Sequence, residues 1–277
     1  MVIEKQASRV IIGGSGPSLA RIDYTRLPTD AQIWRVNDFF KESKYFLGRR
    51  ADAVFNGGHP DIIIDRYHTL RVLAEKNVYD VNFNMIFADK LFDELPDLFK
   101  GHFEKIRELD KANNIGLWSL IEYNDLFLDR HPLTGTCAIL VAMLCGYREI
   151  YLAGIDNDYT MGAQYAYSNQ KTRKSKLKWV ELYHPSDLQW GLIKKYQEKL
   201  GGSKHVKIYS LSLESPAAKI FPMAPINKNA KFKLEAKQSQ QAELLKSPWY
   251  PDSVKLTAEQ DCQKTSVASN KNIFRSF

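Results

Sequence analysis

Residues 10–19 of the chain read VIIGGSGPSL, and this stretch decides the fold. Residues 10–12 form a short β-branched run, which is typical of a buried strand. Residues 14–18 supply the glycines and polar residues of a tight loop, and Pro17 suits the first turn of a helix. A buried strand that continues into a glycine-rich loop and a helix is a typical opening of a parallel α/β sheet.

The rest of the chain alternates between expected strands and helices. Further strands are expected at residues 32–37, 53–56, 81–88, 149–155 and 206–211. Helices are expected at residues 61–76, 136–144 and 185–200, with one or two amphipathic helices within residues 90–112. This alternation predicts an α/β fold with a Rossmann-like parallel sheet flanked by helices. Ligands of such sheets bind at the carboxyl ends of the strands, where several polar residues of this chain lie.

Composition limits the classes of function. The net charge of +7 favours an anionic partner. The chain has no zinc-type cysteine and histidine spacing, helix-turn-helix or RNA-binding aromatic signature, which argues against nucleic acid. No apolar stretch reaches the roughly 20 residues of a membrane-spanning helix, and residues 1–9 lack the apolar middle of a secretory signal. Cys137 and Cys145 lie on one face of an expected helix, which favours buried thiols in a reducing cytoplasm.

Several motifs follow one another along the chain. They are VIIGGSGPSL at residues 10–19, Asn37 followed by KYFLG, AVFN at 53–56, TG at 134–135, GYREIYLAGID at 146–156, YAY at 165–167 and His184. Together they resemble the bacterial sialyltransferases of glycosyltransferase family 42, the Campylobacter-type enzymes of lipooligosaccharide biosynthesis, over most of residues 10–225. The resemblance implies inverting transfer of N-acetylneuraminic acid from CMP-sialic acid to a terminal galactose, without a metal or other cofactor. The linkage formed stays open.

The resemblance also implies an organisation for the chain. Residues 1–157 are the Rossmann-like core that binds the nucleotide sugar, a variant of the GT-A fold. Residues 158–185 are a smaller lid subdomain, and residues 186–226 are the remainder of the core. Residues 227–277 are rich in lysine, serine and glutamine, so we expect a basic tail that packs weakly or associates with the membrane. The expected assembly is a homotetramer, cytoplasmic and peripheral to the inner face of the membrane.

Residues of the expected lid carry the implied chemistry. His184 matches the general base of the family, since a neutral imidazole can take the proton of the attacking hydroxyl. Tyr159 and Tyr165 match the tyrosines that hydrogen-bond the departing phosphate. Arg173, in a basic run, and Arg130, near the place of a family arginine, are further candidates for contact with the phosphate or the acceptor.

The expected donor-binding residues lie at strand ends and at one helix start. Glycines permit close backbone approach, a hydroxyl donates, and a side-chain amide both donates and accepts. The residues are Gly14, Ser15, Gly16, Asn37, Asn56, Thr134, Gly135 and Asp156. The asparagines can alternatively cap turns, and Thr134 can be a plain N-cap.

Two other functions stay open. Asp156 and Asp158 form an Asp-x-Asp pair at a strand end. In many sugar-nucleotide transferases such a pair holds a divalent ion, which indicates a metal-dependent glycosyltransferase with another sugar nucleotide. The other alternative is a non-catalytic protein that binds a nucleotide or a polysaccharide.

Overall fold

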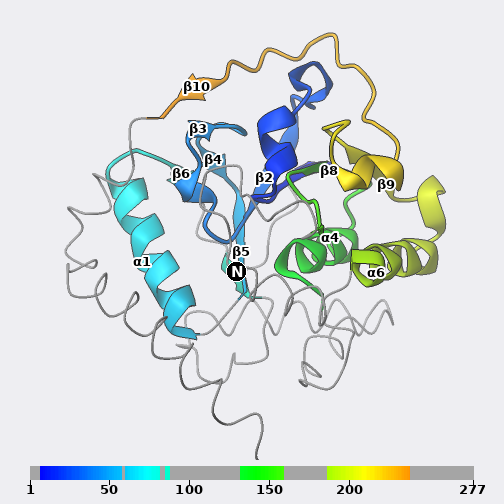
Figure 1. The fold of residues 1–277 in the computed structure, drawn as a ribbon, viewed down its shortest axis with the longest axis horizontal. Helices are drawn as coiled ribbons and strands as arrows, with labels where there is room; N and C mark the ends of the chain where they lie inside the picture. The colour runs from blue at the N-terminus through cyan, green and yellow to red at the C-terminus, as the bar shows by residue number, and fades with distance from the viewer. Residues whose placement is uncertain (1–6, 58–59, 82–84, 88–131, 159–185, 238–277) are drawn as a thin grey trace, which may run out of the picture. The chain divides into compact units, whose positions relative to one another are not determined.

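A six-stranded parallel sheet forms the centre of the fold (Figure 1). The structure is a computed structural model, and it describes residues 7–57, 60–81, 85–87, 132–158 and 186–237. The strands are β1 (Arg9–Gly13), β2 (Ala31–Val36), β5 (Ala53–Asn56), β7 (Met85–Phe87), β8 (Glu149–Ala153) and β9 (Lys207–Ser210). They lie in the order β7-β5-β2-β1-β8-β9, and every neighbouring pair is parallel. The sheet builds outward from β1 in both directions, which confirms the expected Rossmann-like fold.

Two small sheets and several short helices complete the fold. β3 (Lys44–Tyr45) pairs antiparallel with β10 (Glu235–Ala236), and β4 (Arg50–Ala51) pairs parallel with β6 (Asp80–Val81). The strand expected at residues 81–88 therefore contributes to two sheets, through β6 and β7. The 3₁₀ helices are η1 (Pro17–Arg21), η2 (Tyr24–Arg26), η3 (Phe39–Lys41), η5 (Gly202–Lys204) and η6 (Pro216–Lys219).

Three expected α-helices lie among the described residues. They are α1 (Pro60–Glu75), α4 (Thr134–Leu144) and α6 (Ser186–Lys199). Figure 1 shows α4 and α6 side by side, and α4 contacts β1, β2 and β5 as well as α6. None of the helices in the described part of the chain is long and apolar enough to cross a membrane. The helix expected at residues 90–112 lies outside the described residues.

The core is deepest where α4 meets β1. Val10 and Ile12 of β1 have no exposed surface, and every α4 residue from Thr136 to Leu144 is buried. A helix that is apolar on all sides must be covered on all sides, and its contacts with the sheet and with α6 provide this cover. Burial raises the pKa of the Cys137 thiol to about 12, so this thiol is the buried, protonated group expected from the sequence.

Residues 227–237, the described part of the expected tail, contact the core at several points, although none of them is buried. The ring of Phe232 stacks on that of Tyr24 with 4.8 Å between centroids, and β10 pairs with β3. Lys237 donates from Nζ to the Tyr79 hydroxyl at 2.6 Å. We call residues 227–237 the strap; residues 238–277 lie outside the described residues.

Candidate active site

The glycine-rich loop after β1 lies at the carboxyl edge of the sheet, between β1 and β8. The backbone N–H of Gly14 donates to the Ala153 carbonyl at 2.8 Å, and that of Gly16 donates to the Gly154 carbonyl at 2.9 Å. A Cβ at Gly16 would lie 2.9 Å from the Gly154 oxygen and closer still to Asp156 Oδ2. No other residue fits at this position without a shift of the loop or of β8. The loop therefore lies at the topological switch point of the sheet, where such folds bind ligands.

Asp156 holds this loop in place. Its side chain is buried, and its Oδ2 accepts from the Ser18 backbone N–H at 3.0 Å. Its Oδ1 accepts from the Ser18 hydroxyl and, at 2.8 Å, from the Ser215 hydroxyl. Pro17 begins a 3₁₀ helix of 5 residues rather than a longer helix, and the Ser18 amide faces Asp156. The Ser18 backbone N–H therefore binds a carboxylate of the protein itself.

Asn37 lies directly after β2, at the same edge of the sheet. Its φ of 50° is left-handed, a conformation that asparagine tolerates better than most residues. Its backbone N–H donates to the Phe55 carbonyl at 2.7 Å, and its Oδ1 accepts from the backbone N–H of Gly57 at 2.9 Å. Asn37 therefore joins the ends of β2 and β5.

Asn56 and Ser15 carry buried polar atoms that no described residue satisfies. Asn56 has 0% of its surface exposed, and neither Oδ1 nor Nδ2 has a hydrogen-bond partner within the described part of the chain. Ser15 Oγ is likewise buried and without a partner there. Buried polar groups are nearly always hydrogen-bonded, and an unsatisfied one costs about 1–3 kcal/mol. Two such groups lie at the edge where sheets of this kind bind ligands, and a polar ligand there would complete their hydrogen bonds.

The start of α4 lies against the end of β5. The N-cap of α4 is Leu133, so Thr134 is not the N-cap that the sequence left open. The Leu133 backbone N–H donates to Gln189 Oε1 of α6 at 2.8 Å. A Cβ at Gly57 would collide with Thr134 Oγ1, so the Thr134 hydroxyl lies beside the residue that follows Asn56. Gly135 comes next in the chain and contacts the β8 end, because a Cβ there would lie 3.0 Å from Ile155 Cδ1.

The structure brings together, at one edge of the sheet, those expected donor-binding residues that it describes. They are Gly14, Ser15 and Gly16 after β1, Asn37 after β2, Asn56 at the end of β5, Thr134 and Gly135 at the start of α4, and Asp156 after β8. The remaining expected site residues lie outside the described residues: His184, Tyr159, Tyr165, Arg130 and Arg173. Their roles stay predictions.

Two residues at this edge were missed by sequence reasoning, Arg66 and Asp38. Arg66 lies in α1, and its Nε donates to Asp38 Oδ1 at 2.7 Å. Burial raises the pKa of Asp38, but the hydrogen bond and charge of Arg66, with Lys41, outweigh burial, so the pKa lies below its ordinary value. The position of Asp38 next to Asn37 was the one signal that could have pointed to the pair.

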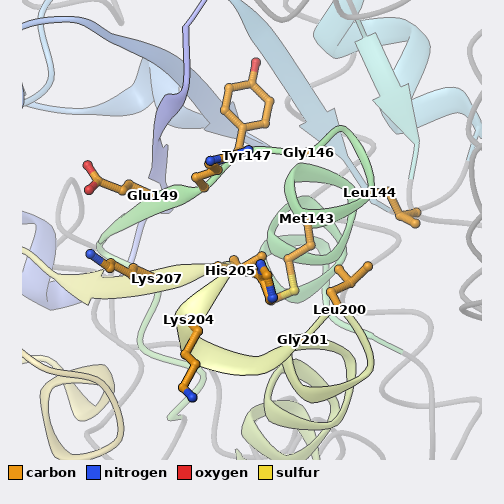
Figure 2. Close-up of a pocket in the computed structure, with 12 residues that line it drawn as sticks. Met143, Leu144, Gly146, Tyr147, Glu149, Leu200, Gly201, Lys204, His205 and Lys207 are labelled. Carbon is orange, nitrogen blue, oxygen red and sulfur yellow. The ribbon is translucent and has the colours of Figure 1, made fainter.

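A cavity of about 560 Å³ lies at the opposite edge of the sheet (Figure 2). Its lining includes Glu149 and Lys207, the first residues of β8 and β9. Figure 2 shows His205 and Met143 among the residues that line this cavity. Because ligands of open α/β sheets bind at the carboxyl ends of the strands, we place the active site at the other edge.

The fold and the site together define a Rossmann-like α/β protein that binds a polar ligand at the switch point of its sheet. Residues 8–253 match the family described as Alpha-2,3-sialyltransferase (CST-I), and the chain belongs to this family. The protein is therefore a sialyltransferase, which confirms the resemblance carried by its sequence motifs.

Solved structures of related enzymes have the same fold. The sialyltransferase CstII from Campylobacter jejuni, in complex with cytidine-5'-monophosphate, is 28% identical, with a TM-score of 0.64 over 83% of this chain and 90% of that chain. CST-II in complex with a trisaccharide acceptor and CMP is 27% identical, with a TM-score of 0.63 over 83% and 91%. The fold of the monofunctional alpha-2,3-sialyltransferase Cst-I from Campylobacter jejuni matches with a TM-score of 0.67 over 96% and 98%, at 24% identity.

The chain is also similar in sequence to a protein of Haemophilus influenzae. This uncharacterized protein of Haemophilus influenzae (strain ATCC 51907 / DSM 11121 / KW20 / Rd) is 28% identical over 195 residues, which are 64% of this chain and 80% of the relative.

Proposed function

We propose that the chain transfers N-acetylneuraminic acid from CMP-sialic acid to a galactose-terminated glycan, with inversion at the anomeric carbon. The acceptor hydroxyl oxygen attacks the anomeric carbon while its proton passes to His184. The bond between that carbon and the phosphate oxygen breaks, and CMP leaves with the bonding electrons. Tyr159 and Tyr165 donate hydrogen bonds to the departing phosphate, and Arg130 and Arg173 add positive charge near the phosphate or the acceptor.

The unsatisfied amide of Asn56 carries this proposal. Its Oδ1 and Nδ2 are both buried without partners in the described structure, so a ligand that contacts this amide can both donate to Oδ1 and accept from Nδ2. Cytosine, ribose and sialic acid all offer both kinds of group. The complexes of CstII with CMP and of CST-II with a trisaccharide acceptor and CMP support the same donor and a glycan acceptor for this chain.

Metal-dependent transfer through Asp156 and Asp158 has less support. Three donor groups from Ser18 and Ser215 already hydrogen-bond the Asp156 carboxylate. A carboxylate accepts about four hydrogen bonds, so a divalent ion would displace contacts that hold the glycine-rich loop. A leaving group with one phosphate also develops less charge than a diphosphate, and phenol and amide donors can stabilise it.

We also propose that the enzyme works in lipooligosaccharide biosynthesis as a homotetramer at the inner face of the cytoplasmic membrane. Three lysines of the strap, Lys228, Lys231 and Lys233, are exposed, and each lysine near an anionic surface contributes about 1 kcal/mol of attraction. A variant with all three replaced by glutamine should lose salt-sensitive binding to phosphatidylserine vesicles and keep its rate on a soluble galactoside.

A panel of sugar nucleotides tests the reaction itself. The purified chain is incubated with each nucleotide sugar and a lactose-type acceptor, and products are separated by mass. We expect transfer from CMP-sialic acid alone. Turnover of a nucleoside diphosphate sugar instead would replace the proposal with the metal-dependent alternative, and binding without slow hydrolysis of any donor would favour the non-catalytic one.

A further inference from the structure

Arg66, in the middle of α1, joins the ends of β2 and β5. Its Nε donates to Asp38 Oδ1 at 2.7 Å and its Nη2 donates to Asp38 Oδ2 at 3.3 Å, which makes a two-pronged ion pair. Its Nη1 donates to the Gly57 carbonyl at 2.7 Å and to Asn37 Oδ1 at 3.4 Å. A planar guanidinium can reach all these acceptors at once, and a lysine ammonium cannot.

The same contacts determine which way the Asn37 amide faces. The backbone N–H of Gly57 can only donate, and so can the Arg66 guanidinium. Both meet the same atom of Asn37, which must therefore be the oxygen Oδ1. The NH₂ group of Asn37 is turned away from both groups, and no described residue accepts a hydrogen bond from it.

We propose that Arg66 is a positioning residue for the donor substrate. With Gly57 it holds Asn37 Oδ1, so that Asn37 offers its NH₂ group to a hydrogen-bond acceptor of the sugar nucleotide. The ligand's identity rests on the function proposed above. Asn37 thus acts as a donor alone, whereas Asn56, with both amide atoms unsatisfied, can donate and accept.

Burial makes the arrangement rigid. The side chain of Arg66 is 14% exposed and that of Asp38 is 20% exposed, so water screens their ion pair only weakly. Asp38 follows Asn37 directly, and the ion pair therefore also restrains the backbone that holds Asn37 at its φ of 50°. Removal of Arg66 should leave the Asn37 amide free to rotate before the substrate binds, and this loss of preorganisation weakens binding.

A double-mutant cycle tests the proposal. Binding of CMP and of CMP-sialic acid is measured by calorimetry for Arg66→Met, Asn37→Ala and the double variant, with Arg71→Met as the control. Arg71 lies on the same helix in an exposed pair with Glu75. We expect Arg66→Met to weaken donor binding about tenfold and to change kcat at saturating donor only little. The double variant should bind the donor almost as tightly as Asn37→Ala alone, because both substitutions remove the same contact with the donor. Losses that multiply would show that Arg66 does not act through Asn37.

The variant Asn37→Asp tests the orientation of the amide directly. An aspartate oxygen can still accept from Gly57 and Arg66, so the local contacts remain. The group that faces the ligand changes from a donor to a charged acceptor, and we expect binding to fall about 100-fold. Binding as tight as in the wild type would overturn the assigned orientation.

Two outcomes separate this inference from the proposed function. A wild-type chain that binds neither CMP nor CMP-sialic acid contradicts the proposed function. A wild-type chain that binds, together with Arg66 variants that bind equally well, contradicts the inference alone. Thermal unfolding of each variant controls for folding. If Arg66→Met does not fold, Arg66→Lys replaces it, because lysine keeps the positive charge. Arg66→Lys should bind the donor as weakly as expected for Arg66→Met, since a lysine ammonium cannot contact Asp38, Gly57 and Asn37 at once.

Discussion

Lys237 Nζ donates to the Tyr79 hydroxyl at 2.6 Å, which joins the end of the strap to the residue before β6. Burial and the positive charge of Arg35 lower the pKa of Lys237 to about 6. The rings of Tyr79 and Tyr45, with centroids 4.6 and 5.4 Å from Nζ, favour the ammonium, but burial outweighs them. In the folded protein the amine is therefore largely uncharged at neutral pH.

This pKa predicts a pH-dependent contribution to stability. The unfolded chain keeps the Lys237 proton up to its ordinary pKa of 10.5, whereas the folded protein releases it near pH 6. Between these values the unfolded state binds more protons, so this group makes the free energy of unfolding rise with pH. The free energy of unfolding is measured with urea for the wild type and for Lys237→Met. The value of the wild type minus that of the variant should increase from about pH 6 to about pH 9. A difference that does not change with pH would contradict the assignment.

Gly16→Ala should destabilise the protein. The added Cβ would lie 2.9 Å from the Gly154 oxygen and closer to Asp156 Oδ2, so the loop after β1 must shift. We expect a loss of about 1–3 kcal/mol in the free energy of unfolding and weaker binding of CMP. Gly191→Ala is the matched control, because it lies in α6 and its added Cβ meets no atom within 4 Å. There alanine should stabilise the protein by about 0.5–1 kcal/mol.

His184→Ala should leave donor binding intact and slow transfer by about 100-fold or more, because a general base typically contributes that much. Single-turnover rates from CMP-sialic acid measure the chemical step, and calorimetry measures binding. His205→Ala provides a control, since His205 lines the cavity at the opposite edge of the sheet. Full activity of the purified His184 variant would refute the role of the base.

Excess chelator should not slow transfer from CMP-sialic acid. The carboxylate of Asp156 already accepts hydrogen bonds from Ser18 and Ser215. We assign stabilisation of the single leaving phosphate to hydroxyl and amide donors instead of a metal ion. Asp158→Ala should then reduce the rate by only a few-fold, about threefold at most. Loss of activity with chelator, restored by manganese or magnesium, would show that the metal-free mechanism is wrong.

Most of the sheet could be predicted from local patterns. The β-branched run of β1 and the near-continuous apolar run of β8 are buried on both faces, so each reads as a strand from composition alone. α4 was equally clear, because a helix that is apolar all around has one possible place, the core. The contacts of the strap could not be predicted, since the stacking of Phe232 on Tyr24 joins residues more than 200 positions apart and leaves no local pattern.

The candidate site could be predicted only in part, for a similar reason. Residues at strand ends converge because parallel strands end at one edge, so Asn37 and Asn56 were found. Arg66 was missed because its role depends on how α1 is placed against the ends of β2 and β5. The hydrogen bond from the Ser215 hydroxyl to Asp156 could not be predicted either, because it joins residues 59 positions apart.

The buried amide of Asn56 has a consequence for the evolution of this chain. Leucine has a similar size and would fill the same space without an unsatisfied polar group, so the ligand-free fold would gain stability from the exchange. Under the function proposed above, asparagine at this position represents a trade-off in which stability of the empty enzyme is given up for recognition of a substrate. Substrate binding then returns part of that stability, so the enzyme is best protected against unfolding in a cell that supplies its substrate.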